Sequence, residues 1–144
     1  MKSDIYQDGI KQLARTMIAS NKLDQPDTSV RLDNRLCGDR VDIELCCNDG
    51  VVTQLHHKVR GCLLCEAATN IVAQHGVGAT IAELENITEQ LINFLNNNDN
   101  SSLPFISSWQ KLNLFSPVSQ HKSRHQCVLL PFQAVQQALA EICQ

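Results

Sequence analysis

The chain has 144 residues, with 12 basic and 15 acidic side chains and a formal net charge of −3. This length suits one domain built around a single core and leaves little room for a second domain. The basic residues are scattered along the sequence, so the composition shows no electrostatic footprint for nucleic acid or anionic lipid and favours proteins or small species as partners.

The first part of the chain predicts one helix followed by an antiparallel sheet. Apolar residues recur at helical spacing from Asp4 to Ser20, which indicates an amphipathic helix. A weak alternation at Thr28 to Leu32 and a clear one on both sides of the Asn-Asp-Gly turn at 48–50 predict a three-stranded meander with one buried face. In the hairpin the alternating set is Val41, Ile43, Leu45 and Cys47, then Val51, Thr53, Leu55, His57 and Val59.

Two helices are predicted after the sheet. The pattern becomes helical from Gly61 to about His75, with Ala67, Ala68, Ile71 and Val72 facing inward, and glycines at 76 and 78 end it. Thr80 and Glu83 have the spacing of a capping box, which marks the start of the second helix.

The last third predicts an insertion and a final helix. The polar stretch that begins at 96 reads as a loop, and the apolar residues after it are interrupted by Pro104 and Pro117. We therefore expect a loop or short helical insertion at about 97–122 that packs on a single domain spanning 1–144. The final helix is expected to begin close to Cys127, because a proline such as Pro131 is tolerated in a first turn but not in a helix interior.

The seven cysteines point to metal or thiol chemistry. No apolar run reaches the length of a membrane span, and the first ten residues carry acids where a signal peptide has basic and then apolar residues, so we expect a cytoplasmic protein. The cytosol keeps thiols reduced and the number of cysteines is odd, which disfavours a disulfide framework.

The positions of the cysteines separate them into two groups. Cys37 lies in a predicted turn, while Cys62 and Cys127 lie near helix starts, where the helix dipole stabilises a thiolate. Together with the nearby Asp39 they would suit zinc or an iron–sulfur cluster, if they meet. The remaining cysteines lie on strands or near the end of the chain and are expected to be bystanders, except Cys65, which forms a Cys-x-x-Cys pair with Cys62.

Three motifs resemble those of the U-type iron–sulfur assembly proteins, the group of IscU, SufU and the NifU N-terminal domain. They are Leu-Cys-Gly-Asp-Arg at 36–40, Gly-Cys at 61–62 and Ser-Arg-His-Gln-Cys at 123–127. Their order, their spacing and the predicted elements that carry them agree with the family over nearly the whole chain. The long interval between the second and third motifs and Arg124 resemble the SufU branch.

The resemblance implies an α+β fold with the cysteines at one exposed end of a small antiparallel sheet. It implies that Cys37, Asp39, Cys62 and Cys127 bind zinc, iron or a 2Fe–2S cluster, and that a cysteine desulfurase delivers sulfur there, with Cys37 or Cys127 as the acceptor. Arg124 is a candidate modulator, and Cys65 and His125 are candidate accessory ligands. The chain would then be a scaffold or sulfur-transfer protein that serves a downstream carrier or apo target proteins, rather than a classical enzyme.

The chain departs from the family pattern at several positions. Leu36 stands where the family usually has proline, and Cys65 and Ala68 stand where it has serines. His125 lies two residues before the last cysteine, not one. Two other function classes stay open: a thiol–disulfide protein that uses Cys62 and Cys65, and a metal-stabilised interaction module that transfers no sulfur.

Overall fold

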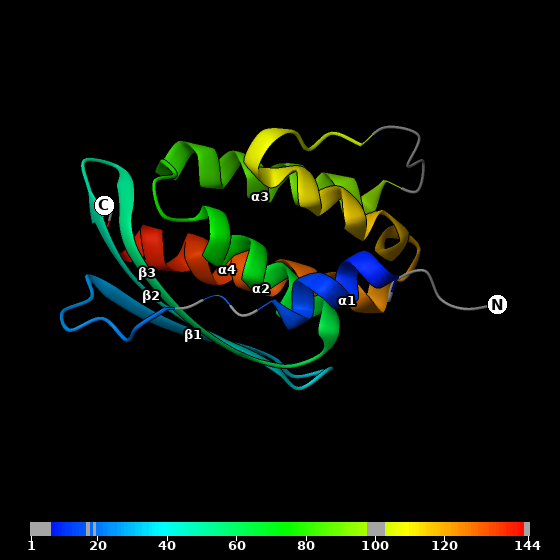
Figure 1. The fold of residues 1–144 in the computed structure, drawn as a ribbon, viewed down its shortest axis with the longest axis horizontal. Coiled ribbons are helices and arrows are strands. Elements are labelled where there is room, and N and C mark those ends of the chain that lie inside the picture. The colour runs from blue at the N-terminus through cyan, green and yellow to red at the C-terminus, as the bar shows by residue number, and fades with distance from the viewer. Residues whose placement is uncertain (1–6, 17, 19, 98–102, 143–144) are drawn as a thin grey trace.

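The computed structural model describes residues 7–16, 18, 20–97 and 103–142. It confirms the predicted α+β fold, with a three-stranded antiparallel sheet in the order β1-β2-β3 and helices against one face (Figure 1). The strands are β1 (Thr28–Asn34), β2 (Asp39–Asn48) and β3 (Val51–Arg60). The helices are α1 (Asp8–Arg15), α2 (Leu63–His75), α3 (Ile81–Asn96) and α4 (His125–Ile142), with the 3-10 helices η2 (Ser107–Gln120) and η3 (Lys122–Arg124). In these ranges no helix is long and apolar enough to cross a membrane.

Helices α2 and α4 cover the inner face of the sheet. Helix α4 packs on β1 and β2, α2 packs on β3, and α1 and α3 lie outside them against α2 and α4 respectively. Figure 1 shows these helices on one side of the strands, so the core lies between the two layers. The residues predicted to face inward from α2 are fully buried: Ala67, Ala68, Ile71 and Val72.

The predicted hairpin is present, but the alternation predicted just after its turn is wrong. A bulge between Cys46 and Cys47 shifts the register, so that Cys47 pairs with Val52. Val52 is therefore fully buried, while Thr53 is exposed. From Leu55 onward the predicted face does pack against the core. A bulge adds one residue to one strand, and a strict period of two cannot anticipate it.

The first helix is shorter than predicted. The described part begins at Asp8, and the helix ends at Arg15 because Thr16 is extended (φ −70°, ψ 124°). Asn70 of α2 accounts for this end, since its Nδ2 donates to the carbonyl oxygens of Leu13 (2.7 Å) and Thr16 (3.0 Å). A side-chain donor thus satisfies helix-end carbonyls that lack an intrahelical partner. The predicted positions 4–6, 17 and 19 lie outside the described residues.

The start of α3 confirms half of the capping box. The Glu83 backbone N–H donates to Thr80 Oγ1 at 3.0 Å, as the sequence predicts. The Glu83 carboxylate, however, accepts a hydrogen bond of 2.8 Å from Trp109 Nε1 in η2 instead of turning back to the helix start. The acidic side chain therefore joins α3 to η2.

The segment predicted as a short helical insertion contains a long 3-10 helix. Trp109, Leu112, Phe115 and Val118 are all buried, and each lies three residues after the one before. Because a 3-10 helix has three residues per turn, this spacing places all four side chains on one face. Residues 98–102, which belong to the predicted loop, lie outside the described part of the chain.

The prediction for the last helix is wrong in one respect. The helix begins at His125, as expected close to Cys127, but Pro131 then lies inside it rather than in its first turn. Proline has no N–H, so Pro131 cannot donate to the carbonyl four residues earlier, which belongs to Cys127. The helix nevertheless continues to Ile142, with Cys127 and Pro131 both buried.

Candidate metal centre

The first part of the site is the connection between β1 and β2. Asn34 and Asp39 are the cross-strand partners that close it. The backbone N–H groups of Cys37 and Gly38 both donate to the Asn34 carbonyl oxygen, at 3.3 and 2.8 Å. Gly38 has a φ of 74°, a left-handed conformation that glycine adopts without steric cost. This turn holds Cys37 half-buried next to the buried Asp39.

The second part is the corner between β3 and α2, where Cys62 is the N-cap residue. The Cys62 backbone N–H donates to Asp39 Oδ1 at 2.9 Å. Gly61 allows this contact, because a Cβ atom at that position would lie 2.3 Å from the same oxygen. A larger residue at 61 would therefore have to displace the Asp39 carboxylate or shift the backbone between β3 and α2.

The third part is the first turn of α4, which carries the fully buried Cys127. The Sγ atoms of Cys37 and Cys127 and a carboxylate oxygen of Asp39 all lie within 4.8 Å of one another. Cys62 is not in this mutually close group, but its sulfur accepts a hydrogen bond from the Cys127 thiol. Four residues that the sequence singled out as ligands thus gather from three separate elements.

The chemistry of these donor atoms fits a thiophilic metal. Zinc in tetrahedral sites is bound by cysteine sulfur at about 2.3 Å, which places two sulfurs on one ion about 4 Å apart. The mutual distances of up to 4.8 Å in the group of Cys37, Asp39 and Cys127 are close to that spacing. The same thiolates are also the ordinary ligands of iron–sulfur clusters.

A hydrogen bond joins the side chains of Cys62 and Cys127. The Cys127 thiol donates to the Cys62 sulfur, which lowers the pKa of Cys62 to about 6, and the Cys65 backbone N–H and the charge of Arg124 also lower it. The same hydrogen bond, together with burial and the nearby Asp39 carboxylate, raises the pKa of Cys127. Cys62 is therefore the thiolate of the pair, as expected for a sulfur at a helix N-terminus. Cys127 is the thiol, because its hydrogen bond to Cys62, its burial and its hydrogen bond to Asp39 outweigh its place in the first turn of α4.

The two candidates just before Cys127 have different surroundings. Arg124 is partly buried at the end of η3, and its charge lowers the pKa of Cys62. His125 directs its Nε2 to the carbonyl oxygen of Ser119 at 3.1 Å, which requires that this nitrogen carry the proton. His125 is not in the mutually close group of metal-ligand atoms.

Cys65 is fully buried in α2, one turn after Cys62. Burial raises the pKa of its thiol, and the negative charges of Asp39 and Cys62 act in the same direction. Cys65 therefore packs in the core as a neutral thiol beside the site. It is not in the mutually close group either.

Asn34 is a site residue that the sequence reading missed. Its Nδ2 donates to Asp39 Oδ2 at 3.4 Å and lies 3.8 Å from Cys127 Sγ, while its side chain is buried. A signal was present, because Val30, Leu32 and Asn34 share the inward face of β1 at a period of two. A polar residue on that face, next to the predicted turn, indicates a buried polar contact.

The other described cysteines take no part in the site. Cys46 directs its Sγ to the Gln25 carbonyl oxygen at 3.5 Å, and the Cys47 backbone N–H donates to Asp27 Oδ2 at 2.8 Å. Both lie on β2, beyond the half of the strand that carries Asp39. Cys143, the last predicted bystander, lies outside the described residues.

The fold and the site define an α+β protein with a cluster of cysteines and an aspartate that could hold a metal ion. Residues 15–104, more than half of the chain, match the NifU-like N-terminal domain family, and the chain belongs to that family. It is 23% identical over 140 residues to the iron–sulfur cluster assembly scaffold protein IscU of Thermotoga maritima, which covers 96% of this chain and 94% of that protein.

One solved structure supports the same family, and a second shares the fold. The crystal structure of a nitrogen-fixing NifU-like protein (N-terminal) from Brucella abortus matches with a TM-score of 0.89 and 31% identity, over 97% of this chain and 95% of that one. A protein described as an iron–sulfur cluster assembly scaffold for the SUF system, from Fervidobacterium islandicum, shares the fold with a TM-score of 0.75 and 21% identity, over 94% of this chain and 96% of that one. The resemblance drawn from the three sequence motifs is therefore confirmed.

Proposed function

We propose that this protein works in iron–sulfur cluster assembly, where it holds a metal and accepts sulfur from a cysteine desulfurase. The observation that carries this proposal is the convergence of Cys37, Asp39, Cys62 and Cys127 from three elements. Membership of the NifU-like family supports it. We also propose that residues 1–144 act as one domain in the cytoplasm, where thiols stay reduced.

The residues around the site would hold and release the metal. A bound zinc or iron ion would keep its sulfur ligands deprotonated at neutral pH. Asp39 is the hard oxygen donor among soft sulfurs, and its two oxygens accept hydrogen bonds from the Cys62 N–H and the Asn34 amide. Because carboxylate oxygen suits a thiophilic metal less well than thiolate does, Asp39 would be the most weakly held of the four candidate ligands.

The sulfur step is a thiol–persulfide exchange. The Cys37 thiolate attacks the terminal sulfur of the desulfurase persulfide, the donor's S–S bond breaks, and the donor leaves as a thiolate. Cys37 then carries the persulfide, and no external oxidant or reductant is consumed. Between the two acceptors that the sequence suggests, we favour Cys37, because it is half-buried on a turn whereas Cys127 is fully buried.

The acceptor is tested by Cys37→Ser and Cys127→Ser in a desulfurase assay with L-cysteine, in which persulfide on this protein and sulfide release are measured. We expect Cys37→Ser to abolish persulfide formation on this protein. Cys46→Ser, which changes a cysteine outside the site, serves as the control and should behave like the wild type. Undiminished transfer by both site variants would refute the proposal.

The identity of the bound metal distinguishes a zinc-dependent sulfur acceptor from a cluster scaffold. Elemental analysis of protein purified without chelators, followed by an absorbance spectrum after anaerobic exposure to iron and sulfide, decides between them. Tight zinc without visible bands favours the acceptor, which the resemblance to the SufU branch also favours. Stable visible bands favour the scaffold. In that case the iron–sulfur cluster assembled on this protein would pass to a carrier or to apo target proteins.

The two alternative functions make different predictions in the same experiments. A redox protein that uses Cys62 and Cys65 would give an oxidisable dithiol and no bound metal. The buried Cys65 thiol with its raised pKa does not support that role, because the thiolate is the reactive form. An interaction module would bind metal and accept no sulfur.

A further inference from the structure

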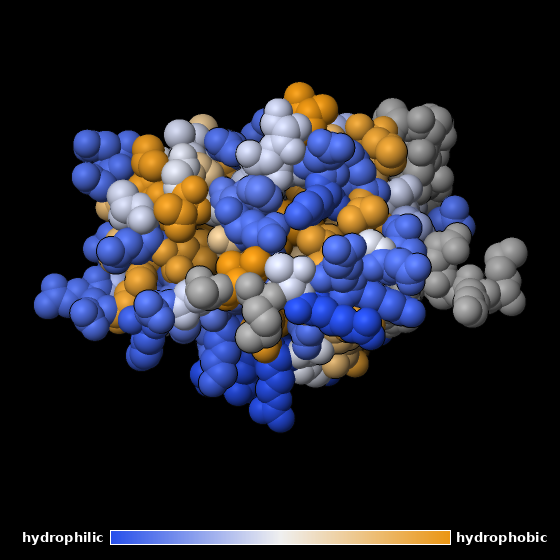
Figure 2. Space-filling view, in the orientation of Figure 1, coloured by the Kyte–Doolittle hydropathy of each residue, from blue (hydrophilic) through white to orange (hydrophobic). Residues whose placement is uncertain are grey.

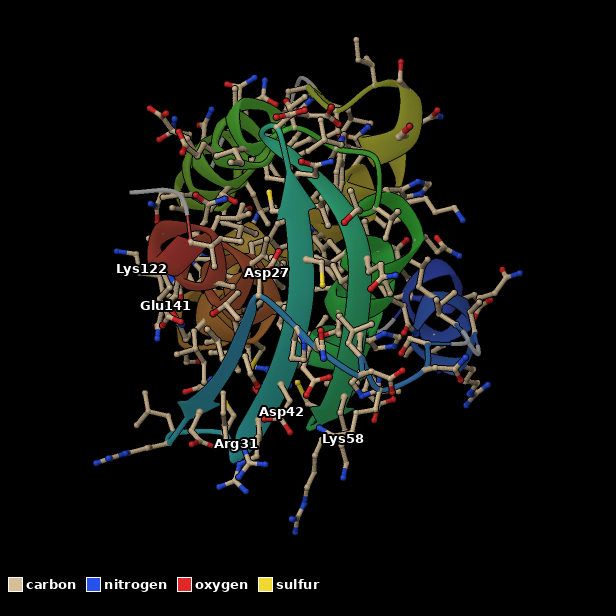
Figure 3. The ribbon with its side chains drawn as sticks, turned by 90° about the vertical axis from the view of Figure 1, so that its left-hand side faces the viewer. Asp27, Arg31, Asp42, Lys58, Lys122 and Glu141 are labelled. Carbon is tan, nitrogen blue, oxygen red and sulfur yellow. The ribbon has the colours of Figure 1, made fainter. Side chains whose placement is uncertain are left out.

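Basic residues that are scattered in the sequence come together on the outer face of the sheet. Cross-strand pairing aligns Arg31, Asp42 and Lys58 in one row and Asp33, Arg40 and Arg60 in the next row toward the site. Figure 3 shows Arg31, Asp42 and Lys58 side by side near one end of the strands. The expectation that the basic residues do not cluster is therefore wrong for this face.

The positive charge on this face is only partly neutralised. Arg31 pairs with Asp42 and Arg40 pairs with Asp33, each at 2.7 Å. Arg35, in the turn before Cys37, and Arg60 are exposed, and neither has an ion-pair partner in the part of the chain that the structure describes. Figure 2 shows strongly hydrophilic side chains along the lower side of the molecule, where the strands lie in Figure 1, as well as over α1. We name Arg35, Arg40, Lys58 and Arg60 the basic rim.

Three residues of the basic rim line a cavity that reaches the candidate metal ligand Asp39. This cavity has a volume of about 470 Å³ and is lined by Asp33, Asn34, Arg35, Gly38, Asp39, Arg40 and Arg60. Arg35, Arg40 and Arg60 thus line the same cavity as Asp39, and Asp33, the ion-pair partner of Arg40, lies among them. Guanidinium groups present donors in a planar fork that matches a carboxylate.

An exposed apolar side chain lies next to this cavity. Leu36 precedes Cys37 and is 90% exposed, the largest exposed fraction among the exposed large hydrophobic residues that the structure describes. It is not on a loose loop, because its backbone N–H donates to Asn34 Oδ1 at 3.3 Å. An exposed apolar side chain beside arginines without ion-pair partners fits a protein interface, which has an apolar centre and a polar rim.

We propose that the basic rim and Leu36 form a docking surface for a protein that presents an acidic surface around an apolar pocket. This proposal rests on the proposed function, since the partner is taken to carry the sulfur donor. Its carboxylates would face Arg35, Arg40 and Arg60, and its apolar pocket would receive Leu36. Docking there places the donor sulfur at Cys37, which follows Leu36 directly. Charge complementarity of this kind mainly increases the rate of productive encounter.

The test is the concentration dependence of sulfur transfer from the purified cysteine desulfurase of the same organism. The double variant Arg35→Glu/Arg60→Glu should raise KM by at least about tenfold, with kcat and metal content unchanged, because the encounter is weakened and the ligands are not altered. The KM of the wild type should also rise more steeply with added salt than that of the variant. Leu36→Ser should raise KM without changing the dependence on salt.

The matched control is Arg15→Glu/Lys111→Glu, which makes the same change in net charge. Both residues are exposed and lie on α1 and η2, and the charge of Lys111 acts on His75 at the opposite end of α2 from Cys62. This control should leave KM unchanged.

The outcomes separate the two proposals. Sulfur transfer by the wild type, with equal KM for the test and control variants, would overturn the docking surface and leave the proposed function standing. No transfer by the wild type would overturn both. Binding of labelled single-stranded RNA that is lost in Arg35→Glu/Arg60→Glu, with KM unaffected, would assign the surface to nucleic acid and overturn the proposal.

Discussion

Asp39 receives hydrogen bonds from two directions, and these contacts decide where its carboxylate lies. The Cys62 N–H holds Oδ1 and the Asn34 amide holds Oδ2. Because Asn34 also lies 3.8 Å from Cys127 Sγ, one amide orients two candidate ligands. Groups that orient ligands in this way generally contribute to metal affinity although they do not bind the metal.

We therefore predict that Asn34→Ala weakens zinc binding by about 10- to 100-fold. The measurement is a competition titration against a chromophoric chelator. Asn70→Ala is the matched control, because Asn70 is also a buried asparagine but donates to the end of α1 instead of the site. The control should lower the free energy of unfolding and keep the zinc affinity. Equal zinc affinity for Asn34→Ala and the wild type would show that Asn34 has no such role.

Among the elements, η2 shows how a local period defines an unusual helix. Its four buried apolar residues lie three positions apart, from Trp109 to Val118. Pro117 cannot donate to the Leu114 carbonyl three residues earlier, and Gln7 Nε2 donates to that oxygen instead at 2.7 Å. The N-terminal segment thus supplies the hydrogen bond that the proline removes.

This packing predicts a large difference between neighbouring positions in η2. Leu112→Ala should lower the free energy of unfolding by about 2–5 kcal/mol, because it leaves a cavity under a fully buried side chain. Gln110→Ala, at an exposed position of the same helix, should change it by less than about 0.5 kcal/mol. Urea denaturation measures both. Similar effects at the two positions would mean that η2 does not pack by a three-residue period.

The elements also show where sequence reasoning succeeds and where it stops. The strands and α2 follow from local periodicity, and their alternation and helical spacing are visible without tertiary information. The bulge at Cys46, the end of α1 at Arg15 and the interior position of Pro131 depend on contacts with distant residues. The period of two along β1 could have placed Asn34 on the inward face, but its partners Asp39 and Cys127 come together only when β1, β2 and α4 meet.

For the molecule as a whole, Glu44 couples stability to pH. Segment 20–27 crosses the outer face of the sheet, and there Glu44 accepts hydrogen bonds from Lys22 Nζ (2.7 Å) and the Leu23 N–H (3.1 Å). The pKa of Glu44 is lower than its usual value, mainly because of the hydrogen bond from Lys22. The hydrogen bond from the Leu23 N–H lowers the pKa further. The unfolded chain therefore binds more protons in acid, so this stabilisation is complete above the unfolded pKa of about 4.3 and is lost as the pH falls through the folded pKa.

Glu44→Gln should accordingly lower the free energy of unfolding at pH 7 by about 1–3 kcal/mol and flatten its fall below about pH 4.3. Urea denaturation at a series of pH values measures the difference from the wild type. Glu89→Gln, at an exposed position of α3, is the control and should leave the pH dependence unchanged. If the free energy of unfolding of the wild type and that of Glu44→Gln fall in parallel below about pH 4.3, Glu44 is not the source of the pH dependence.

The metal site is expected to contribute to the stability of the whole molecule because its candidate ligands tie the β1–β2 turn to the starts of α2 and α4. A ligand that binds only the folded state stabilises it by about 2.7 kcal/mol at one hundred times its Kd. Removing zinc with a chelator should therefore lower the melting temperature of the wild type and of Cys46→Ser to the same extent. Cys37→Ser/Cys127→Ser should start at the lower value and not respond to the chelator, since the convergent sulfurs are gone. Equal melting temperatures of the wild type with and without zinc would mean that zinc does not bind preferentially to the folded chain, and would contradict this prediction.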